Sequence, residues 1–242
     1  VKYSANLECF YFTLLHERGL YMATSIFVYN LTPSTPKLAA DIYRTLSNVP
    51  DDGPNYFNLQ LLNENELSGE YVIVQTVEES FYNPIDRVFE QRKASKATIV
   101  DFTICNDRLE IWGNRTNANK LIFAISSATQ NIFSINAVNI SIENIISKLQ
   151  AYKVKVSKVC FEDFLFSEDI VGNFTVDLST YGDVFAVLNK YKEKIARMTA
   201  ILPCEGTSLK ITFSSKGTVM VYKTRDSFED DMLDMLHAIL LK

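Results

Sequence analysis

Two stretches of this chain share one order of elements: a strand, a tight turn, a second strand and then an amphipathic helix. In the first stretch, apolar and polar residues alternate over 100–111 around a turn at Asn106-Asp107. In the second, they alternate over 209–221. Alternation of this kind predicts antiparallel strands with one buried face. Because such hairpins bury that face under their helices, we expect an α+β fold, a two-layer sandwich with helices on one face.

The two stretches resemble each other in a further detail. Each hairpin ends in an aromatic residue followed shortly by an arginine, Trp112 with Arg115 and Tyr222 with Arg225. Residues 161–198 have a third, looser copy of the strand–strand–helix order. Duplication of one β-β-α unit and chance similarity both explain this pattern, since a hairpin followed by a helix is common in α+β proteins.

The rest of the chain gives a coarser outline. The patterns predict strands over 26–31, 57–62, 71–77 and 154–161, helices over about 35–49, 142–149 and 184–195, a linker or short helix over 85–95, and a turn at Gly172-Asn173. The helix near residue 35 takes Ser34 or Thr35 as its cap, and the helix near residue 121 takes Thr116. We expect an N-terminal α+β segment over 1–95, of which 1–21 is possibly not native, and an α+β domain over 96–242.

Composition narrows the class of protein. Of 242 residues, 47% are hydrophobic and 22% are charged, which is typical of a soluble globular chain and excludes wholesale disorder. No stretch of about 18 residues is apolar without a charge, so the sequence predicts no membrane span and no membrane partner. We expect a cytoplasmic protein of a prokaryotic system.

Common cofactor and metal motifs are missing from the sequence. It contains no G-x-G-x-x-G, no G-x-x-x-x-G-K-[ST] and no G-x-S-x-G. The four cysteines lie far apart with no C-x-x-C pair, which disfavours a zinc site and predicts buried, reduced thiols; they are Cys9, Cys105, Cys160 and Cys204. We therefore expect no cofactor and no metal.

Positive charge suggests one binding hypothesis. The net charge of −5 disfavours a protein that mainly coats phosphate backbones, although a local basic stripe remains compatible with it. Aromatic residues beside cations can stack on single-stranded bases. The candidate nucleic-acid-binding residues are Trp112, Arg115, Lys148, Lys153, Lys155, Lys158, Tyr222 and Arg225. Alternatively, the lysines solvate an edge strand, with Val154 and Val156 on its buried face.

Carboxylates suggest a second hypothesis, a metal-dependent hydrolase or nuclease. Two metal ions over a phosphate need clustered acidic side chains. The candidate clusters are Glu162-Asp163, Glu168-Asp169 and Glu229-Asp230-Asp231 with Asp234. The last cluster also fits the first turns of a helix, where negative charge is favourable, and the others fit solvated turns.

Scarce catalytic motifs and abundant apolar residues favour a third hypothesis over these two. We expect a non-catalytic interaction module that binds a protein partner or a second copy of itself. Nucleic-acid binding and carboxylate-based hydrolysis remain the alternatives.

Overall fold

The structure is a computed structural model that describes residues 23–49, 53–138, 140–167, 170–204, 207–223 and 227–240. Residue contacts divide the chain into two compact units. Unit 2 consists of 25–142 and 214–219, and unit 1 consists, within the described residues, of 23–24, 143–213 and 220–240. The chain therefore leaves unit 2 after residue 142 and returns to it for six residues near the C-terminal end.

Unit 2 contains one antiparallel sheet. Its strands are β1 (Thr24–Thr32), β2 (Asn55–Asn63), β3 (Glu66–Asn83), β4 (Val88–Cys105), β5 (Arg108–Gly113) and β6 (Ser134–Ala137). Their order is β2-β3-β4-β5-β1, and β6 pairs with the edge of β1 that faces away from β5. The hairpin of β4 and β5 turns at Asn106, whose φ of 55° suits asparagine in a tight turn.

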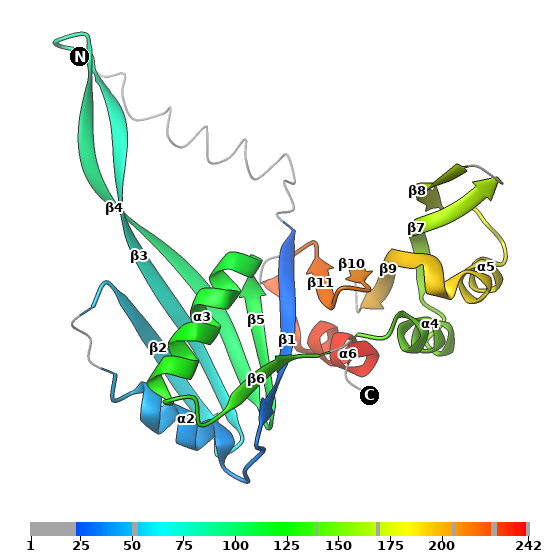
Figure 1. The fold of residues 1–242 in the computed structure, drawn as a ribbon, viewed down its shortest axis with the longest axis horizontal. Coiled ribbons are helices and arrows are strands. Elements are labelled where there is room, and N and C mark those ends of the chain that lie inside the picture. Colours follow the sequence, from blue (N-terminus) through cyan, green and yellow to red (C-terminus); the bar gives the residue numbers. More distant parts are fainter. Residues whose placement is uncertain are drawn as a thin grey trace. The chain divides into compact units, whose positions relative to one another are not determined.

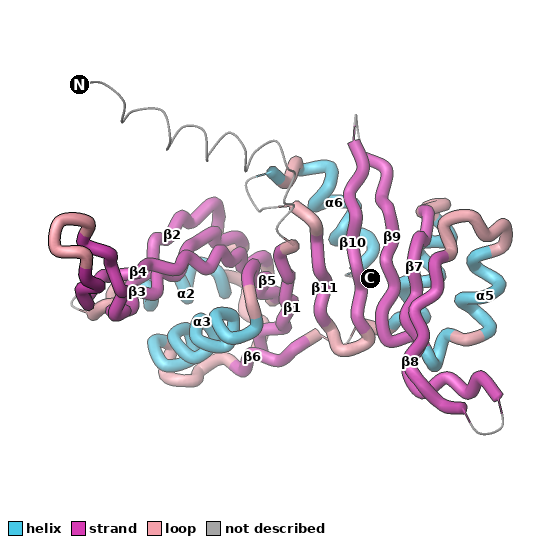
Figure 2. The backbone as a smooth tube through the Cα atoms, turned by 90° about the horizontal axis from the view of Figure 1, so that it is seen from above, coloured by secondary structure: helices cyan, strands magenta, loops and turns pink. Residues whose placement is uncertain are grey.

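Helices α2 (Leu38–Leu46) and α3 (Arg115–Ala128) lie on one face of this sheet (Figures 1 and 2). Leu38, Ile42 and Leu46 of α2 are buried because their fourfold spacing puts them on one side of the helix. They meet the alternating side chains Val100, Phe102 and Ile104 of β4 and the α3 residues Leu121 and Ile125. This cluster is the hydrophobic core of unit 2.

Unit 1 has a second set of strands and helices. It comprises α4 (Ile142–Ala151), β7 (Lys155–Ser167), β8 (Ile170–Asp177), α5 (Val184–Lys190), the 3-10 turn η1 (Lys192–Lys194), β9 (Ile195–Cys204), β10 (Thr207–Ser214), α6 (Asp230–Leu240) and the end of β11 (Thr218–Val221). The strand order is β11-β10-β9-β7-β8. Strand β7 pairs antiparallel with both β8 and β9. Buried side chains from β9, β10 and α6 include Met198, Ile211 and Met232.

The predicted α+β class is confirmed. The order strand–strand–helix occurs as β4-β5-α3, β7-β8-α5 and β10-β11-α6. No helix among the described residues is long and apolar enough to cross a membrane. Residues 1–21, which the sequence marked as possibly not native, lie outside the described part of the chain.

Three predictions about elements were wrong. Residues 88–95 form part of strand β4 rather than a linker or short helix, so the expected boundary at 95–96 falls inside a strand. The helix predicted over 184–195 ends at Lys190, and strand β9 begins at Ile195 and includes Pro203. Gly172 pairs with Phe164 within the β7–β8 ladder instead of forming its turn.

Candidate protein-interaction site

Strands β3 and β4 continue well past the rest of the unit 2 sheet (Figure 1). The last partner of β2 on β3 is Ile73, and the last partner of β5 on β4 is Asp101. Beyond these points, the described pairings of Val74–Asn83 are with Val88–Ala97 alone. We call residues 74–97 the ribbon. An isolated two-stranded ribbon is marginally stable in water, so side-chain pairs along it matter.

Opposite charges face each other across the ribbon. Glu78 is directly opposite Lys93, and Glu79 is directly opposite Arg92. Arg92 also forms an ion pair with Glu90 at 2.8 Å, and its guanidinium lies 5.8 Å from the centre of the Phe81 ring. Directly opposed unlike charges stabilise an antiparallel pair by roughly 0.2–1 kcal/mol each. The charged side chains therefore support the ribbon itself.

Asn83 holds the turn at the end of the ribbon. Its Oδ1 accepts from the backbone N–H of Ile85 at 3.0 Å, and its Nδ2 donates to Asp86 at 2.8 Å and to Glu90 at 2.6 Å. The hydrogen bond from Asn83, followed by the hydrogen bond and the charge of Arg92, holds the pKa of Glu90 below its usual value. The turn is thus a defined structure.

The side chains around this turn are apolar and exposed. Ile85 is 89% exposed and Phe89 is 72% exposed. The rings of Tyr82 and Phe89 lie side by side across the two strands, with centroids 5.3 Å apart. We call the set the apolar tip; it consists of Phe81, Tyr82, Ile85, Val88 and Phe89. The register places Phe81 and Val88 on one face of the ribbon and Tyr82 and Phe89 on the other. Groups of exposed apolar side chains of this kind mark interaction surfaces in soluble proteins.

A groove of about 910 Å³ lies at the other end of the ribbon. It runs between α3, the start of β2 and the part of β3 where the ribbon leaves the sheet. Its lining residues are Val49, Asn55, Phe57, Tyr71, Ile73, Val74, Gln75, Thr116, Asn119, Lys120, Phe123, Ala124, Ser127 and Ala128. Lys120 is the one charged residue of this lining, and Phe123 is 76% exposed.

Aromatic rings form the floor of the groove. Phe57 packs on Tyr71 with ring centroids 4.8 Å apart and meets Phe102 edge-on at 6.3 Å. Burial raises the pKa of Tyr71, and a hydrogen bond with Asn55 opposes that shift. Asn55 also accepts from the N–H of Val74 at 3.0 Å, which ties β2 to the first residue of the ribbon. The groove is therefore preformed, apolar and bordered by amides.

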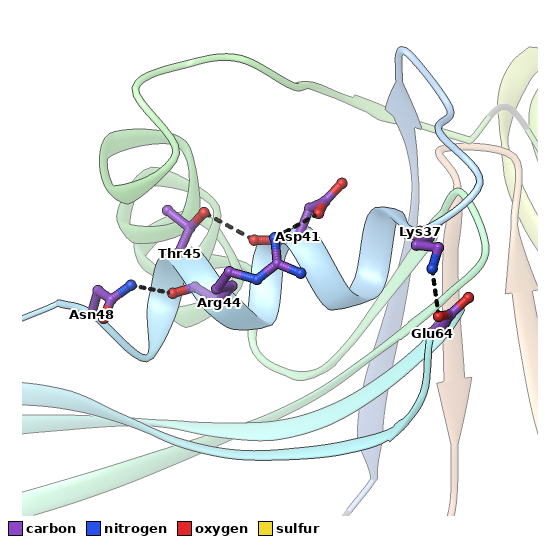
Figure 3. A network of polar contacts seen from close by, with 6 residues as sticks. All are labelled: Lys37, Asp41, Arg44, Thr45, Asn48 and Glu64. Atoms are coloured by element: carbon purple, nitrogen blue, oxygen red, sulfur yellow. Dashed lines mark hydrogen bonds and ion pairs between the residues drawn. The ribbon is translucent and has the colours of Figure 1, made fainter.

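Polar contacts run along helix α2, which ends shortly before the groove residue Val49 (Figure 3). Thr45 donates to the carbonyl of Asp41 at 2.9 Å, and Asn48 donates to the carbonyl of Arg44 at 2.8 Å. At the start of the helix, Lys37 forms an ion pair with Glu64 at 2.6 Å. Two of these contacts are local to the last turns of α2, and the ion pair links the start of the helix to the residues after β2.

No protein-family model and no curated protein matches this chain.

Two of the residues predicted to contact nucleic acid lie in unit 2. Trp112 on β5 pairs with Ile26 of β1 and is 3% exposed, so its ring offers almost no surface to a base. Arg115 begins α3; its guanidinium lies 5.4 Å from the centre of the Phe27 ring and donates to the hydroxyl of Thr218 at 3.3 Å. Both side chains therefore have structural contacts in their own unit.

The predicted lysines all lie in unit 1. Lys148 donates from Nζ to the carbonyls of Ala238 at 3.1 Å and Ile239 at 3.2 Å, near the C-terminal end of α6, where positive charge is favourable. Lys153 lies in the turn after α4 with a φ of 54°. Lys155 and Lys158 are exposed on β7.

The alternation predicted for β7 is confirmed, since Val154 and Val156 are buried while Lys155 is exposed. The edge-strand interpretation was wrong, because β7 lies between β8 and β9. Hydrogen bonds from the hydroxyl and amide of Ser179 hold the pKa of Asp177 below its usual value, and the charges of Lys158 and Lys155 add to that shift. Part of the lysine charge therefore faces a carboxylate.

Of the second aromatic–arginine pair, the structure describes Tyr222. Lys210 lies over the Tyr222 ring, 5.0 Å from its centre, so this ring already has a cation beside it. Arg225 lies outside the described residues, as do Glu168 and Asp169 of the acidic clusters. Among the described residues, no three His, Cys, Asp or Glu side chains are grouped closely enough to hold a metal ion.

The prediction of buried thiols was wrong for one cysteine. Cys105 is exposed, whereas Cys160 and Cys204 are half-buried; all three are free, and Cys9 lies outside the described residues. Burial raises the pKa of the Cys204 thiol, and the charge of Asp231 adds to the shift.

The order of charges in the sequence does indicate the ribbon, although the apolar periodicity of each segment does not. Glu78 and Lys93 stand at equal distances from the middle of the turn, between Ile85 and Asp86, and so do Glu79 and Arg92. This mirrored order of opposite charges is typical of two strands that pair with each other.

Proposed function

We propose that this chain is a non-catalytic binding module that contacts a protein, either another chain or a second copy, through the ribbon of unit 2. The observation that carries the proposal is the apolar tip, five exposed side chains at the end of two strands that extend beyond their sheet. Interface cores are enriched in aromatic side chains, and the tip contributes three of them. The groove supplies a second apolar surface in the same unit.

Site-specific photo-crosslinking tests this proposal. A benzoylphenylalanine at Ile85 is compared with one at Leu165, which is also exposed but belongs to unit 1. The purified protein and an extract of its native cells are irradiated. We expect protein adducts from position 85 alone, and competition by excess unlabelled wild-type protein but not by the double variant Ile85→Asp/Phe89→Ser. Equal adducts from both positions would contradict the proposal.

Nucleic-acid binding is the second candidate, and the exposed Lys153, Lys155 and Lys158 favour it. Binding through these lysines releases counterions and therefore weakens steeply as salt rises. Fluorescence anisotropy with a labelled single-stranded oligonucleotide at 50 and 200 mM salt measures this. The triple variant with glutamine at the three lysines should abolish the binding, and binding equal at both salt concentrations would exclude this candidate.

A further inference from the structure

Strand β2 is the outermost strand at one end of the unit 2 sheet, and its outer edge has no strand partner among the described residues (Figure 1). Backbone N–H and C=O groups at such an edge are a template to which another strand can add. Proteins commonly protect an edge of this kind with lysine, other charged side chains or proline. The nine residues of β2, Asn-Tyr-Phe-Asn-Leu-Gln-Leu-Leu-Asn, include none of these. The sequence of β2 therefore does not oppose the addition of a strand.

This edge strand also exposes apolar side chains. Tyr56, Leu61 and Leu62 are 37%, 38% and 51% exposed. Phe57 and Leu59 are half-buried and pack against the core of unit 2. A strand added to this edge removes apolar surface from water in addition to forming backbone hydrogen bonds, and both effects favour the pairing.

The order of side chains in β2 is symmetric about its middle residue, Leu59. Outward from Leu59, both directions give an amide, an apolar residue, a second apolar residue and a final amide. When two copies of a strand pair antiparallel about a two-fold axis, one residue lies opposite its own copy. With Leu59 at that position, apolar side chains face apolar ones and amides face amides throughout. The pairs are Asn58 with Gln60, Phe57 with Leu61, Tyr56 with Leu62 and Asn55 with Asn63.

The neighbouring registers lack this match. A pair centred on Asn58 sets Tyr56 opposite Gln60, and a pair centred on Gln60 sets Asn58 opposite Leu62. A shift of two residues in either direction sets an amide opposite an apolar side chain at every position except the centre. A strand that binds a different protein has no need of a symmetric order, because its complement can have any sequence. A two-fold interface does need it, since the same surface is used on both chains, and the symmetry therefore favours a second copy as the partner.

The three central pairs lie in the regular part of the strand. The ladder of β2 with β3 is regular from Asn55 to Leu61 and shifts between Leu61 and Asn63. A two-fold axis perpendicular to the sheet keeps the helix-covered faces of both copies on the same side. Because alternate residues share a face, Phe57 of one copy approaches Leu61 of the other on that side.

We propose that β2 pairs with β2 of a second copy of this chain, antiparallel and centred on Leu59, in a two-fold dimer that joins the two unit 2 sheets edge to edge. This inference goes beyond the proposed function, because the pairing residues lie outside the ribbon. Each copy uses its β2 edge once, so the assembly closes at two chains.

Charge substitutions at the central amide pair test the register. Asn58→Lys/Gln60→Lys sets like charges directly opposite each other, whereas Asn58→Lys/Gln60→Glu sets opposite charges there. Both side chains are exposed, and the two double variants change the same positions. In sedimentation equilibrium, we expect wild type and the second double variant to dimerise, and the first to dimerise at least tenfold more weakly. Val171→Lys, on the exposed end strand β8, is the control and should dimerise like wild type.

Cysteine crosslinking tests the contact itself. In a Cys105→Ser background, chains with Asn58→Cys are mixed with chains carrying Gln60→Cys. Directly opposed residues lie about 4.5–5.5 Å apart, within reach of a disulfide, whereas two copies of position 58 are diagonal neighbours roughly 7–8 Å apart. We expect a disulfide-linked dimer from the mixture and from neither variant alone. The mixture of Gln60→Cys with Val171→Cys is the control that should stay unlinked.

Failure of this inference differs from failure of the proposed function. A monomeric wild type, or equal dimerisation of the two double variants, overturns the pairing of β2 and leaves binding through the ribbon standing. Loss of the dimer in Ile85→Asp/Phe89→Ser, with full dimerisation of Asn58→Lys/Gln60→Lys, also overturns it, because the ribbon then holds the two copies together. A β2-dependent dimer without protein adducts at position 85 overturns the proposed function alone.

Discussion

Gly69 of β3 lies where the core leaves no room for a side chain. A Cβ at this position would lie 2.7 Å from Cζ of Phe102 and 2.9 Å from Cδ2 of Leu59. Phe102 is among the largest fully buried side chains and belongs to the core of unit 2, so its ring cannot simply move aside. A glycine is therefore required here by a close approach between strand and core.

Gly69→Ala should lower the free energy of unfolding by about 1–3 kcal/mol, the usual cost of overpacking a core. Urea denaturation followed by circular dichroism measures it. Gly182→Ala is the control, because no atom lies within 4 Å of a Cβ at that position. Equal stability of the two variants would show that the core around Phe102 yields more easily than its packing implies.

The residue that caps α3 differs between the sequence prediction and the structure. The sequence favoured Thr116, whereas Asn114 accepts from the backbone N–H of Asn117 at 2.9 Å and is the residue that caps the helix. Asn114→Ala should cost about 1 kcal/mol in thermal or urea unfolding. Thr116→Ala should cost much less. The reverse order would assign the cap to Thr116.

Cys105 is exposed, yet the pKa of its thiol is raised. Partial burial raises the pKa of its thiol, and the carboxylates of Glu66 and Glu110 raise it further, while Arg108 lowers it. Because the thiolate is the nucleophile, alkylation by iodoacetamide at pH 8 should be slower than in the unfolded chain, and its rate should rise toward higher pH. Glu66→Gln should accelerate it. Peptide mass spectrometry of the segment around Cys105 follows the rate; a thiol as reactive as that of the unfolded chain would contradict this.

Among the elements, those with a regular period were predictable from the sequence. Alternation at Val100, Phe102 and Ile104 identified β4, and the fourfold spacing of Leu38, Ile42 and Leu46 identified α2. These patterns exist because each element buries one face against the core. Where no face is buried, the pattern disappears.

The ribbon and β9 show this limit. Residues 88–95 have solvent on both faces, so their strand comes from pairing with β3, a partner that a local period cannot reveal. The predicted helix was extended to Ile195 because this residue continued the apolar spacing of Val184 and Leu188, although Met198, Ala200 and Leu202 alternate after it as a strand does. The apolar tip was missed because residues 85–95 were predicted as a linker or short helix, so no pairing with β3 was expected there.

Removal of the ribbon should leave the rest of unit 2 folded. In the variant, residues 76–95 are replaced by Asn-Gly, a sequence that suits a two-residue hairpin turn between Gln75 and Lys96. Since the removed residues pair only with each other in the described structure, we expect native circular dichroism and cooperative melting. Loss of cooperative melting would show that the core of unit 2 depends on the ribbon.

At the scale of the whole molecule, the chain order of the two units could not be read from composition. Residues 214–219 belong to unit 2 although the segments on both sides belong to unit 1. Thr218 contacts Arg115, about a hundred residues earlier in the chain. A return of the chain over so long a distance leaves no pattern in the local sequence. The predicted division into 1–95 and 96–242 was placed where the apolar pattern changes, and those residues belong to the ribbon.

Each unit should respond to damage in its own core. Leu121→Ala in unit 2 and Met198→Ala in unit 1 both remove a fully buried side chain, at a cost of about 2–5 kcal/mol. Hydrogen exchange with mass spectrometry should show Leu121→Ala accelerating exchange mainly in β3–β5 and Met198→Ala mainly in β7–β10. Acceleration of equal size throughout both units would show a single cooperative body.

Insertions and deletions in its two strands can change the length of the ribbon. One residue added to each strand lengthens it by about 3.4 Å and turns every later side chain to the opposite face, and a second pair restores the original face. Since the added residues would pair only with each other, such changes leave the core of unit 2 untouched. Insertions or deletions of two residue pairs therefore change the distance of the apolar tip from the sheet in fixed steps. Each tip side chain stays on its original face of the ribbon.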